Sequence, residues 1–173
     1  MTTEKNLLSP AIRKHIDEWV ERYPEEHKRS GVFEALRVVQ ETHNGSLTTE
    51  LMDAVADYLG MPHIAVYEVA TFYSMYYLNP MGKHVIDVCT NISCMLSGST
   101  EIVNHLKQRL GVEVGGTTTD GQFTLKSVEC LGACVGAPAC QIGKKYYEHL
   151  TPEKMDDILA QLASSPRKVT HGE

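Results

Sequence analysis

Apolar residues recur at helical spacing through the first eighty positions of the chain, with polar residues between them. The first stretch follows Ser9, a residue type that caps helices, and Pro10, which favours the first helical turn. Gly60 lies just past another stretch, where glycine commonly ends a helix. The pattern predicts four helices: one from Ser9 to before Pro24, one carried by residues 32–39 and ending near Asn44-Gly45, one from Thr48 to Gly60, and one from Pro62 toward Phe72.

Beyond residue 80 short apolar runs replace this pattern and predict strands at 84–88 and 123–128 and a hairpin of 140–142 with 145–147. Two helices complete the region: one capped by Ser97 or Ser99 and bearing Ile102, Val103, Leu106 and Leu110, and one from Thr151-Pro152 with Met155, Ile158, Leu159 and Leu162 inside. The order strand–helix–strand–strand–helix is thioredoxin-like. We therefore expect an α+β chain, in which an N-terminal helical bundle precedes a thioredoxin-like βαββα domain.

These patterns divide the chain into a helical module over residues 1–80, a mixed domain over 81–164, and a polar, mobile tail over 165–173. The junction is aromatic, reading YEVATFYSMYY from Tyr67 to Tyr77, and Asn79 to Gly82 resemble a linker. The aromatic segment could stack on a ligand or form a packed hinge between the modules, and we favour the hinge.

Composition narrows the classes of function. The formal net charge of -6 and pI of about 5.7 argue against nucleic acid as the main partner. No run of 18 apolar residues predicts a membrane-spanning helix, and the N-terminus does not resemble a secretory leader. We therefore expect a cytosolic chain, in which paired cysteines act as metal ligands or redox thiols more often than as structural disulfides.

Four of the five cysteines form two close pairs after the predicted strands. Cys89 and Cys94 are spaced C-x4-C, and Cys130 and Cys134 are spaced C-x3-C. Four thiolates from two neighbouring loops suit an iron–sulfur cluster or Zn²⁺. Zinc knuckles usually read C-x2-C, so both gaps here favour iron–sulfur, while zinc and a redox dithiol stay open.

Several neighbours of the cysteines suit an anionic [2Fe–2S] cluster. Glycines would let backbone N–H groups approach the sulfurs, and a helix beginning just after Cys94 would add a favourable dipole. A ring of apolar residues would limit water near the cluster. The glycines are Gly98, Gly132 and Gly136, and the ring is Met95, Leu96, Leu131 and Val135.

The remaining candidate ligands give weaker signals. Cys140 follows Pro138 closely at the start of a predicted strand, so we interpret it as a small buried hydrophobe rather than a fifth ligand. The histidines are scattered and never paired at i,i+3 or i,i+4: His15, His27, His43, His63, His84, His105, His149 and His171. Without a phosphate-binding loop or a Rossmann glycine motif, we expect the chain to bind neither NAD nor FMN by itself.

The cysteine loops resemble those of a known family. FTLKSVECLGACVGAP (Phe123 to Pro138) is similar to the second ligand loop of the small thioredoxin-like [2Fe–2S] subunit, of the E type, of respiratory complex I, NADH:quinone oxidoreductase. DVCTNISCMLSG resembles its first ligand loop and VATFYSMYY its inter-module segment, and the likeness spans about Leu8 to Leu162. It implies that Cys89, Cys94, Cys130 and Cys134 hold one [2Fe–2S] cluster. The family usually has Met or Leu where this chain has Cys140, which fits a packing role.

The resemblance also implies a function. The cluster would exchange single electrons with FMN on a larger NADH-oxidising flavoprotein subunit, beside other peripheral-arm iron–sulfur subunits, and this chain would carry no catalytic residue. In the family the cluster lies off the main relay to quinone, which implies electron storage or a shorter lifetime of reduced flavin. The implied location is the cytoplasmic side of the inner membrane, without membrane insertion. The alternatives are the diaphorase subunit of an NAD-linked hydrogenase or formate dehydrogenase, and a structural zinc module with four cysteine ligands.

Overall fold

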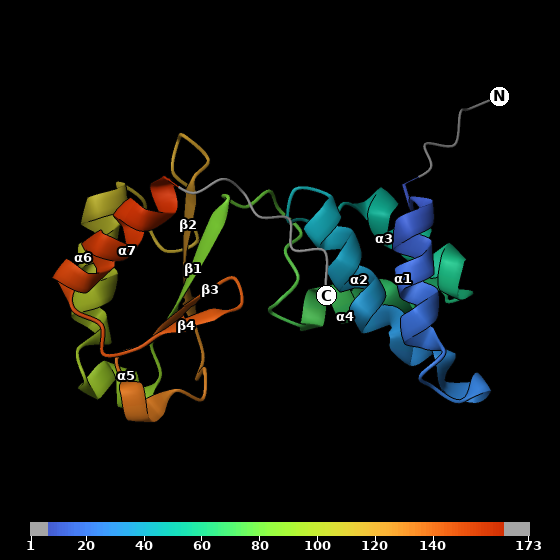
Figure 1. Ribbon diagram of the computed structural model, residues 1–173, viewed down its shortest axis with the longest axis horizontal. Coiled ribbons are helices and arrows are strands. Elements are labelled where there is room, and N and C mark those ends of the chain that lie inside the picture. Colours follow the sequence, from blue (N-terminus) through green and yellow to red (C-terminus); the bar gives the residue numbers. More distant parts are fainter. Residues whose placement is uncertain (1–6, 165–173) are drawn as a thin grey trace. The chain divides into compact units, whose positions relative to one another are not determined.

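The computed structural model describes residues 7–164 and shows two compact units, which divide between Pro80 and Met81 (Figure 1). The tail predicted over residues 165–173 lies outside the described residues. Among residues 7–164, no helix is both long and apolar enough to cross a membrane.

The N-terminal unit consists of helices around one apolar core. They are α1 (Pro10–Val20), the 3-10 helix η1 (Glu25–Gly31), α2 (Val32–Thr42), α3 (Thr49–Leu59) and α4 (His63–Phe72). The side chain of Ser9 accepts from the N–H of Ile12 at 3.3 Å and that of Thr48 from Leu51 at 3.4 Å, while Gly60 ends α3 in the left-handed region. The four predicted helices are therefore confirmed. Their inner faces include the fully buried Ile16, Leu36, Val39, Val55 and Val66.

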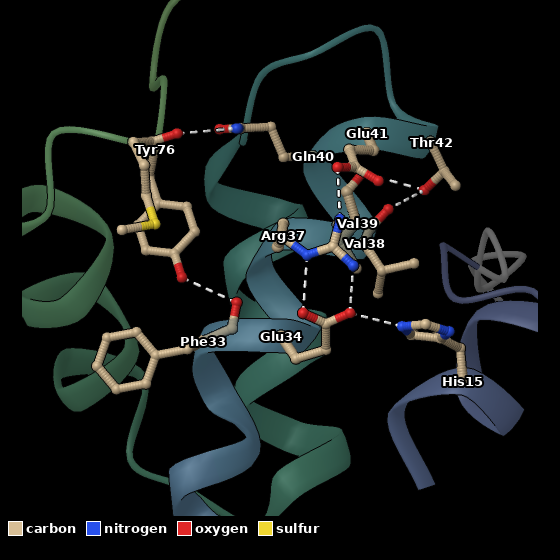
Figure 2. Close-up of polar contacts among 11 residues, drawn as sticks. His15, Phe33, Glu34, Arg37, Val38, Val39, Gln40, Glu41, Thr42 and Tyr76 are labelled. Carbon is tan, nitrogen blue, oxygen red and sulfur yellow. Dashed lines mark hydrogen bonds and ion pairs between the residues drawn. The ribbon is translucent and has the colours of Figure 1, made fainter. Parts of the chain in front are cut away.

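A buried carboxylate joins α1 to α2 (Figure 2). Glu34 accepts from the His15 ring at 2.6 Å and from the Arg37 guanidinium, whose Nε lies 2.7 Å away. Arg37 extends the network to Glu41 at 2.5 Å. Burial opposes ionisation of Glu34, but the hydrogen bonds from Arg37 and His15 outweigh it and lower its pKa. The N-terminal core thus contains a paired charge.

The aromatic segment after α4 is held against α2 at Tyr76. The Tyr76 side chain is buried, and its hydroxyl donates to the Phe33 carbonyl at 2.8 Å (Figure 2). Phe72 and Met75 are exposed by 79% and 56%, so this segment packs through one of its faces only.

The C-terminal unit is built on a mixed sheet of order β2-β1-β3-β4. Its strands are β1 (His84–Cys89), β2 (Phe123–Val128), β3 (Cys140–Ile142) and β4 (Lys145–Tyr147). β1 pairs parallel to β2 and antiparallel to β3. Helices α6 (Ser99–Leu110) and α7 (Pro152–Ala163) lie on the same side of the sheet (Figure 1). The shared core includes Ile86, Leu125, Ile102, Leu106 and Met155. The predicted strands and the last helix are confirmed.

The connection from β1 to α6 differs from the prediction. A short helix, α5 (Ile92–Leu96), lies between them and contains Cys94. The expected cap of the longer helix by Ser97 or Ser99 is wrong, because Gly98 occupies that position with φ +98 and without a side-chain cap. Glycine adopts this left-handed conformation at no steric cost, so the chain can turn directly from one helix into the next.

Candidate metal centre

The topology brings both cysteine pairs to one end of the sheet. Cys89 is the last residue of β1 and lies opposite Val128, the last residue of β2, in parallel register. The carboxyl ends of two parallel strands meet at the same edge, so the loops that follow them are neighbours. Cys94 lies in α5, and Cys130 and Cys134 follow β2, with Cys134 opening the 3-10 turn η2 (Cys134–Gly136). Figure 1 shows α5 and the orange η2 turn together at this end.

The four thiols form an inner and an outer pair. Cys89 and Cys94 are buried and hydrogen-bonded to each other, while Cys130 and Cys134 are exposed with their sulfurs 3.5 Å apart. Cys134 interacts electrostatically with both inner cysteines. In the part of the chain that the structure describes, no three His, Cys, Asp or Glu side chains are grouped as ligands for one ion. The arrangement is two thiols from each of two loops.

Hydrogen-bond donors are aimed at these sulfurs. The backbone N–H groups of Asn91 and Leu131 donate to Cys89, and that of Ala139 donates to Cys94. The N–H of Gly132 lies 3.4 Å from Cys130 Sγ. Sulfurs of a thiolate-ligated cluster carry negative charge, and such donors stabilise that charge. The donor set therefore fits a [2Fe–2S] cluster.

The environment sets the thiol pKa values in different directions. Burial works against the Cys89 thiolate, but the hydrogen bonds from Asn91 N–H, Leu131 N–H and Cys94 outweigh it and lower the pKa of Cys89. Burial, together with the neighbouring Cys89, raises the pKa of Cys94. The hydrogen bond with Cys130 raises the pKa of Cys134, and the Ser93 hydroxyl partly opposes that shift. The deprotonated form of Cys89 is thus favoured relative to an ordinary thiol.

Polar contacts fasten the first cysteine loop to the second. The hydroxyls of Thr90 and Ser127 lie 2.7 Å apart, and Asn91 donates to the carboxylate of Glu129 at 2.8 Å. The N–H of Cys89 donates to the Ala139 carbonyl at 3.1 Å. These contacts join the residues at and after the end of β1 to the end of β2 and to the segment before β3.

Two of the features expected around the cysteines are differently placed. Gly132 adopts φ +78 and donates to a sulfur, as expected, whereas Gly136 packs against Glu148, whose side chain a Cβ would meet at 2.6 Å. The expected helix beginning just after Cys94 is also wrong, because Cys94 lies inside α5.

The apolar ring does not shield the site within this chain. Met95, Leu96 and Val135 are exposed by 50%, 78% and 100%, and only Leu131 is half-buried. The expectation that this ring limits water near the cluster is therefore not met within the chain alone, because three of its four side chains are themselves exposed to solvent.

Cys140 lies on the opposite face of the sheet from Cys89. It pairs with Val88 across β1 and β3, so both side chains enter the core under α6 and α7, while Cys89 faces away. Cys140 is 0% exposed, and burial raises the pKa of its thiol to about 12. The expected packing role is confirmed.

Three of the histidines that the structure describes pair with carboxylates. Within residues 7–164, His15 pairs with Glu34, His63 with Asp53 and Asp57, and His105 with Asp156. His171 lies outside that range.

Comparison with known proteins identifies close relatives of the chain. Residues 16–163 match the model of the thioredoxin-like [2Fe–2S] ferredoxin family. The chain is 46% identical over 143 residues to the NADH-quinone oxidoreductase E-type subunit of Rickettsia bellii (strain RML369-C), covering 83% of this chain and 86% of that protein. It is 40% identical over 156 residues to an NADH-quinone oxidoreductase E-type subunit of Rhizobium meliloti (strain 1021), covering 90% and 91%.

Solved structures with a similar fold include NAD+-reducing [NiFe]-hydrogenase. Its H2-reduced form gives a TM-score of 0.68 at 20% identity over 79% of this chain. The air-oxidised form gives 0.59 at 15% identity over 94% of this chain. This chain spans 23% and 24% of those hydrogenase chains.

Proposed function

Because this chain belongs to the thioredoxin-like [2Fe–2S] ferredoxin family, we propose that it is the E-type electron-transfer subunit of an NADH-quinone oxidoreductase. In this proposal Cys89, Cys94, Cys130 and Cys134 hold one [2Fe–2S] cluster. The observation that carries it is the meeting of two cysteine pairs, with hydrogen-bond donors aimed at their sulfurs, at the carboxyl ends of two paired parallel strands.

A bound [2Fe–2S] cluster gains or loses one electron at a time. The residues of this chain position it and adjust its charge balance. Cys89 and Cys94 enter from the sheet and a short helix, which limits their movement, and the N–H groups of Leu131, Gly132 and Ala139 stabilise negative charge on the sulfurs. FMN and NADH belong to the neighbouring NADH-oxidising subunit, with which the cluster exchanges single electrons.

The partner flavoprotein would cover the end of the sheet that carries the cysteines. Exposed apolar side chains gather in sequence around the ligands, namely Ile92, Met95, Leu96 and Val135. We define these four residues as the rim. Such side chains favour burial against a partner. Docking there would supply the shielding from water that the chain lacks and would place the cluster next to the flavoprotein that feeds it.

The finer features of the parent complex are part of the proposal. The N-terminal helices would act as a bundle whose exposed Phe72 and Met75 offer a second contact surface toward other peripheral-arm iron–sulfur subunits. The complex would lie on the cytoplasmic side of the inner membrane.

A diaphorase subunit of an NAD-linked hydrogenase or formate dehydrogenase is the second candidate, favoured by the fold shared with the hydrogenase chains. Neighbouring genes distinguish the candidates. Genes for proton-pumping membrane subunits favour the NADH-quinone oxidoreductase, and a gene for a nickel–iron or molybdenum subunit favours the alternative.

The test is metal analysis of anaerobically purified protein. Two irons and two acid-labile sulfides per chain, with an S = 1/2 EPR signal after dithionite, are expected. Cys94→Ser should abolish the signal, and Cys140→Ala, which changes a core residue on the other face, should keep it. One zinc, no iron and no signal after reconstitution would instead make the chain a structural zinc module.

A further inference from the structure

A hydrogen bond between Asn91 and Glu129 joins the two cysteine loops. Asn91 lies between Cys89 and Cys94, and Glu129 immediately precedes Cys130. The side-chain amide nitrogen of Asn91 donates to the Glu129 carboxylate at 2.8 Å, although the two residues are 38 positions apart in the sequence. The bond therefore connects the chain between the first two cysteines to the chain directly before the third.

The same asparagine side chain also begins α5. Its amide oxygen accepts from the N–H of Ile92 at 2.9 Å, and the Asn91 carbonyl accepts from the N–H of Met95 at 2.9 Å. Asn91 is therefore the N-cap of the short helix that contains Cys94. The oxygen of one side chain orients this helix, while its nitrogen binds the second loop.

The Asn91–Glu129 bond extends the alignment of the two parallel strands. The pairing of β1 with β2 ends where Cys89 lies opposite Val128. The N–H of the next residue, Thr90, donates to the Val128 carbonyl at 3.1 Å. The bond between Asn91 and Glu129 comes one residue later, just past the ends of both strands. The side chains thus continue the alignment into the loops that carry the remaining cysteines.

The exposure of this bond limits what it can contribute to folding. Asn91 is half-buried and Glu129 is exposed, so water competes for both groups and the bond adds little to the stability of the unit. Its effect on a bound group is different, because ligands that are already aligned lose less conformational freedom on binding than ligands on mobile loops. Loss of the bond should therefore weaken the hold on a cluster more than it weakens the fold.

We propose that Asn91 is a positioning residue, which aligns the two cysteine loops for cluster binding through its hydrogen bond to Glu129. The inference rests on the ligand set of the proposed function. Asn91 acts through the loops and contributes no ligand of its own.

The experiment removes this bond in two ways and then restores it. Asn91→Ser keeps an oxygen that can cap α5 but is too short to reach Glu129, and it leaves the net charge unchanged. Asn91→Asp also keeps the cap but places one carboxylate against another. In Asn91→Asp combined with Glu129→Gln, the new amide can donate to the new carboxylate, so the bond returns with donor and acceptor exchanged and with the wild-type net charge. Arg109→Gln, which removes an exposed contact with Asp156 in the same unit, is the matched control.

The readouts are the rate at which reconstituted full-length protein releases iron to a chelator under anaerobic conditions and the width of its EPR signal after dithionite. Asn91→Ser and Asn91→Asp should reconstitute with two irons and two sulfides but release iron about threefold to tenfold faster than wild type, which corresponds to one hydrogen bond. Their EPR signals should be broader, because the ligand geometry is less uniform. The double variant should return both values toward wild type, and Arg109→Gln should change neither. The urea midpoint of the apoprotein should be the same in all variants.

The controls separate alignment from charge. If charge near the cluster were the cause, Asn91→Ser would release iron at the wild-type rate, and that result overturns the proposal. A double variant as fast as Asn91→Asp also overturns it. If Asn91→Asp fails to hold iron, retention of iron by the double variant supports the proposal and loss from both overturns it. A wild-type protein without iron or sulfide after reconstitution would overturn the proposed function instead.

Discussion

The side-chain oxygen of Gln40 accepts a hydrogen bond from the backbone N–H of Tyr77 at 2.7 Å, while the amide nitrogen of the same side chain donates to the Met75 carbonyl at 3.1 Å. Gln40 is only 8% exposed. One buried side chain of α2 thus binds two backbone groups of the segment that follows α4, as a neighbouring strand would.

We call these two hydrogen bonds the Gln40 clamp. Their loss should release the segment that contains Met75 and Tyr77 from α2. We expect Gln40→Ala to lower the free energy of unfolding by about 1–3 kcal/mol, because two partly buried backbone groups lose their partners. Hydrogen exchange at the Tyr77 amide should accelerate by at least tenfold. Gln141→Ala, which removes an exposed side-chain bond to Gly143, serves as the control and should change little. Unchanged Tyr77 protection in Gln40→Ala would contradict the clamp.

The pairing of Glu34 should make the stability of the N-terminal unit depend on pH. Its pKa is lowered in the folded protein despite burial, because Arg37 and His15 bond the carboxylate. The stabilisation is therefore present above the ordinary pKa of 4.5 and is lost as the pH falls below it toward the lowered folded value. Glu34→Gln should cost about 1–3 kcal/mol at pH 7, a value discounted because Arg37 is partly exposed. Urea unfolding at pH 7 and pH 3.5 measures both effects.

Two comparisons control that prediction. The difference between wild type and Glu34→Gln should shrink at pH 3.5, since below the ordinary pKa of 4.5 the carboxyl is protonated in the unfolded chain and folding must then ionise it. Glu25→Gln, which disrupts an exposed pair with Lys28, should have little effect at either pH. A Glu34→Gln penalty that stays constant across this range would exclude the charged pair as its cause.

Cys140 should behave as a core residue and not as a reactive thiol. Its pKa of about 12 keeps the sulfur protonated at pH 8, so it should stay unmodified by thiol reagents in the native apoprotein and react only after unfolding. Cys140→Ala should lower the free energy of unfolding by about 1 kcal/mol through lost packing. Cys140→Ser should lower it further, because the new hydroxyl would be buried in an apolar core. A thiol titration with and without denaturant compares the number of reactive thiols in the unfolded and folded protein. Labelling of Cys140 in the native protein would argue against this packing.

Gly82 should tolerate no side chain. A Cβ at this position would lie 2.7 Å from the carbonyl carbon of Phe123, and backbone atoms cannot move aside as a flexible side chain can. Gly82→Ala should destabilise the C-terminal unit by about 1–3 kcal/mol. Gly60→Ala is the comparison: nothing lies within 4 Å of its Cβ, and only the left-handed backbone costs free energy, about 1 kcal/mol. Thermal unfolding of both variants should rank Gly82→Ala as the less stable.

The rim should matter for association and not for folding. Val135 is fully exposed, so Val135→Asp should change the free energy of unfolding by less than about 0.5 kcal/mol. Its dissociation constant for the flavoprotein subunit should rise at least tenfold, about 1.4 kcal/mol, because a carboxylate would be buried at the contact. Val114→Asp, an exposed apolar site outside the rim, provides the control. Equal affinities of Val135→Asp and wild type would remove the rim from the interface.

The sequence was informative where a local rule acts alone. Ser9, Thr48 and Gly60 bound the helices that they predict, because caps depend on a few neighbouring atoms. The neighbouring positions of the two cysteine loops were expected because each cysteine pair follows a predicted strand. The short helix α5 was missed, because five residues are too few to display a period.

Contacts between side chains far apart in the chain could not be predicted from the sequence. The hydrogen bonds of Gln40 to Tyr77 and Met75 join residues whose types are common on any surface. The apolar ring of Met95, Leu96, Leu131 and Val135 was misjudged for a related reason: apolar letters look the same whether a side chain lies in a core, as at Cys140, or is exposed, as at Val135.

The parallel pairing of β1 with β2 also sets the order in which the site can come into existence. Each cysteine pair is local in sequence, but the two meet only through a pairing between distant segments, which is the slow kind of contact to form. During synthesis Cys89 and Cys94 emerge first and remain a half-complete site until β2 has been translated and aligned. The iron and sulfide that mature the protein should therefore be delivered after translation, to a sheet that has already formed.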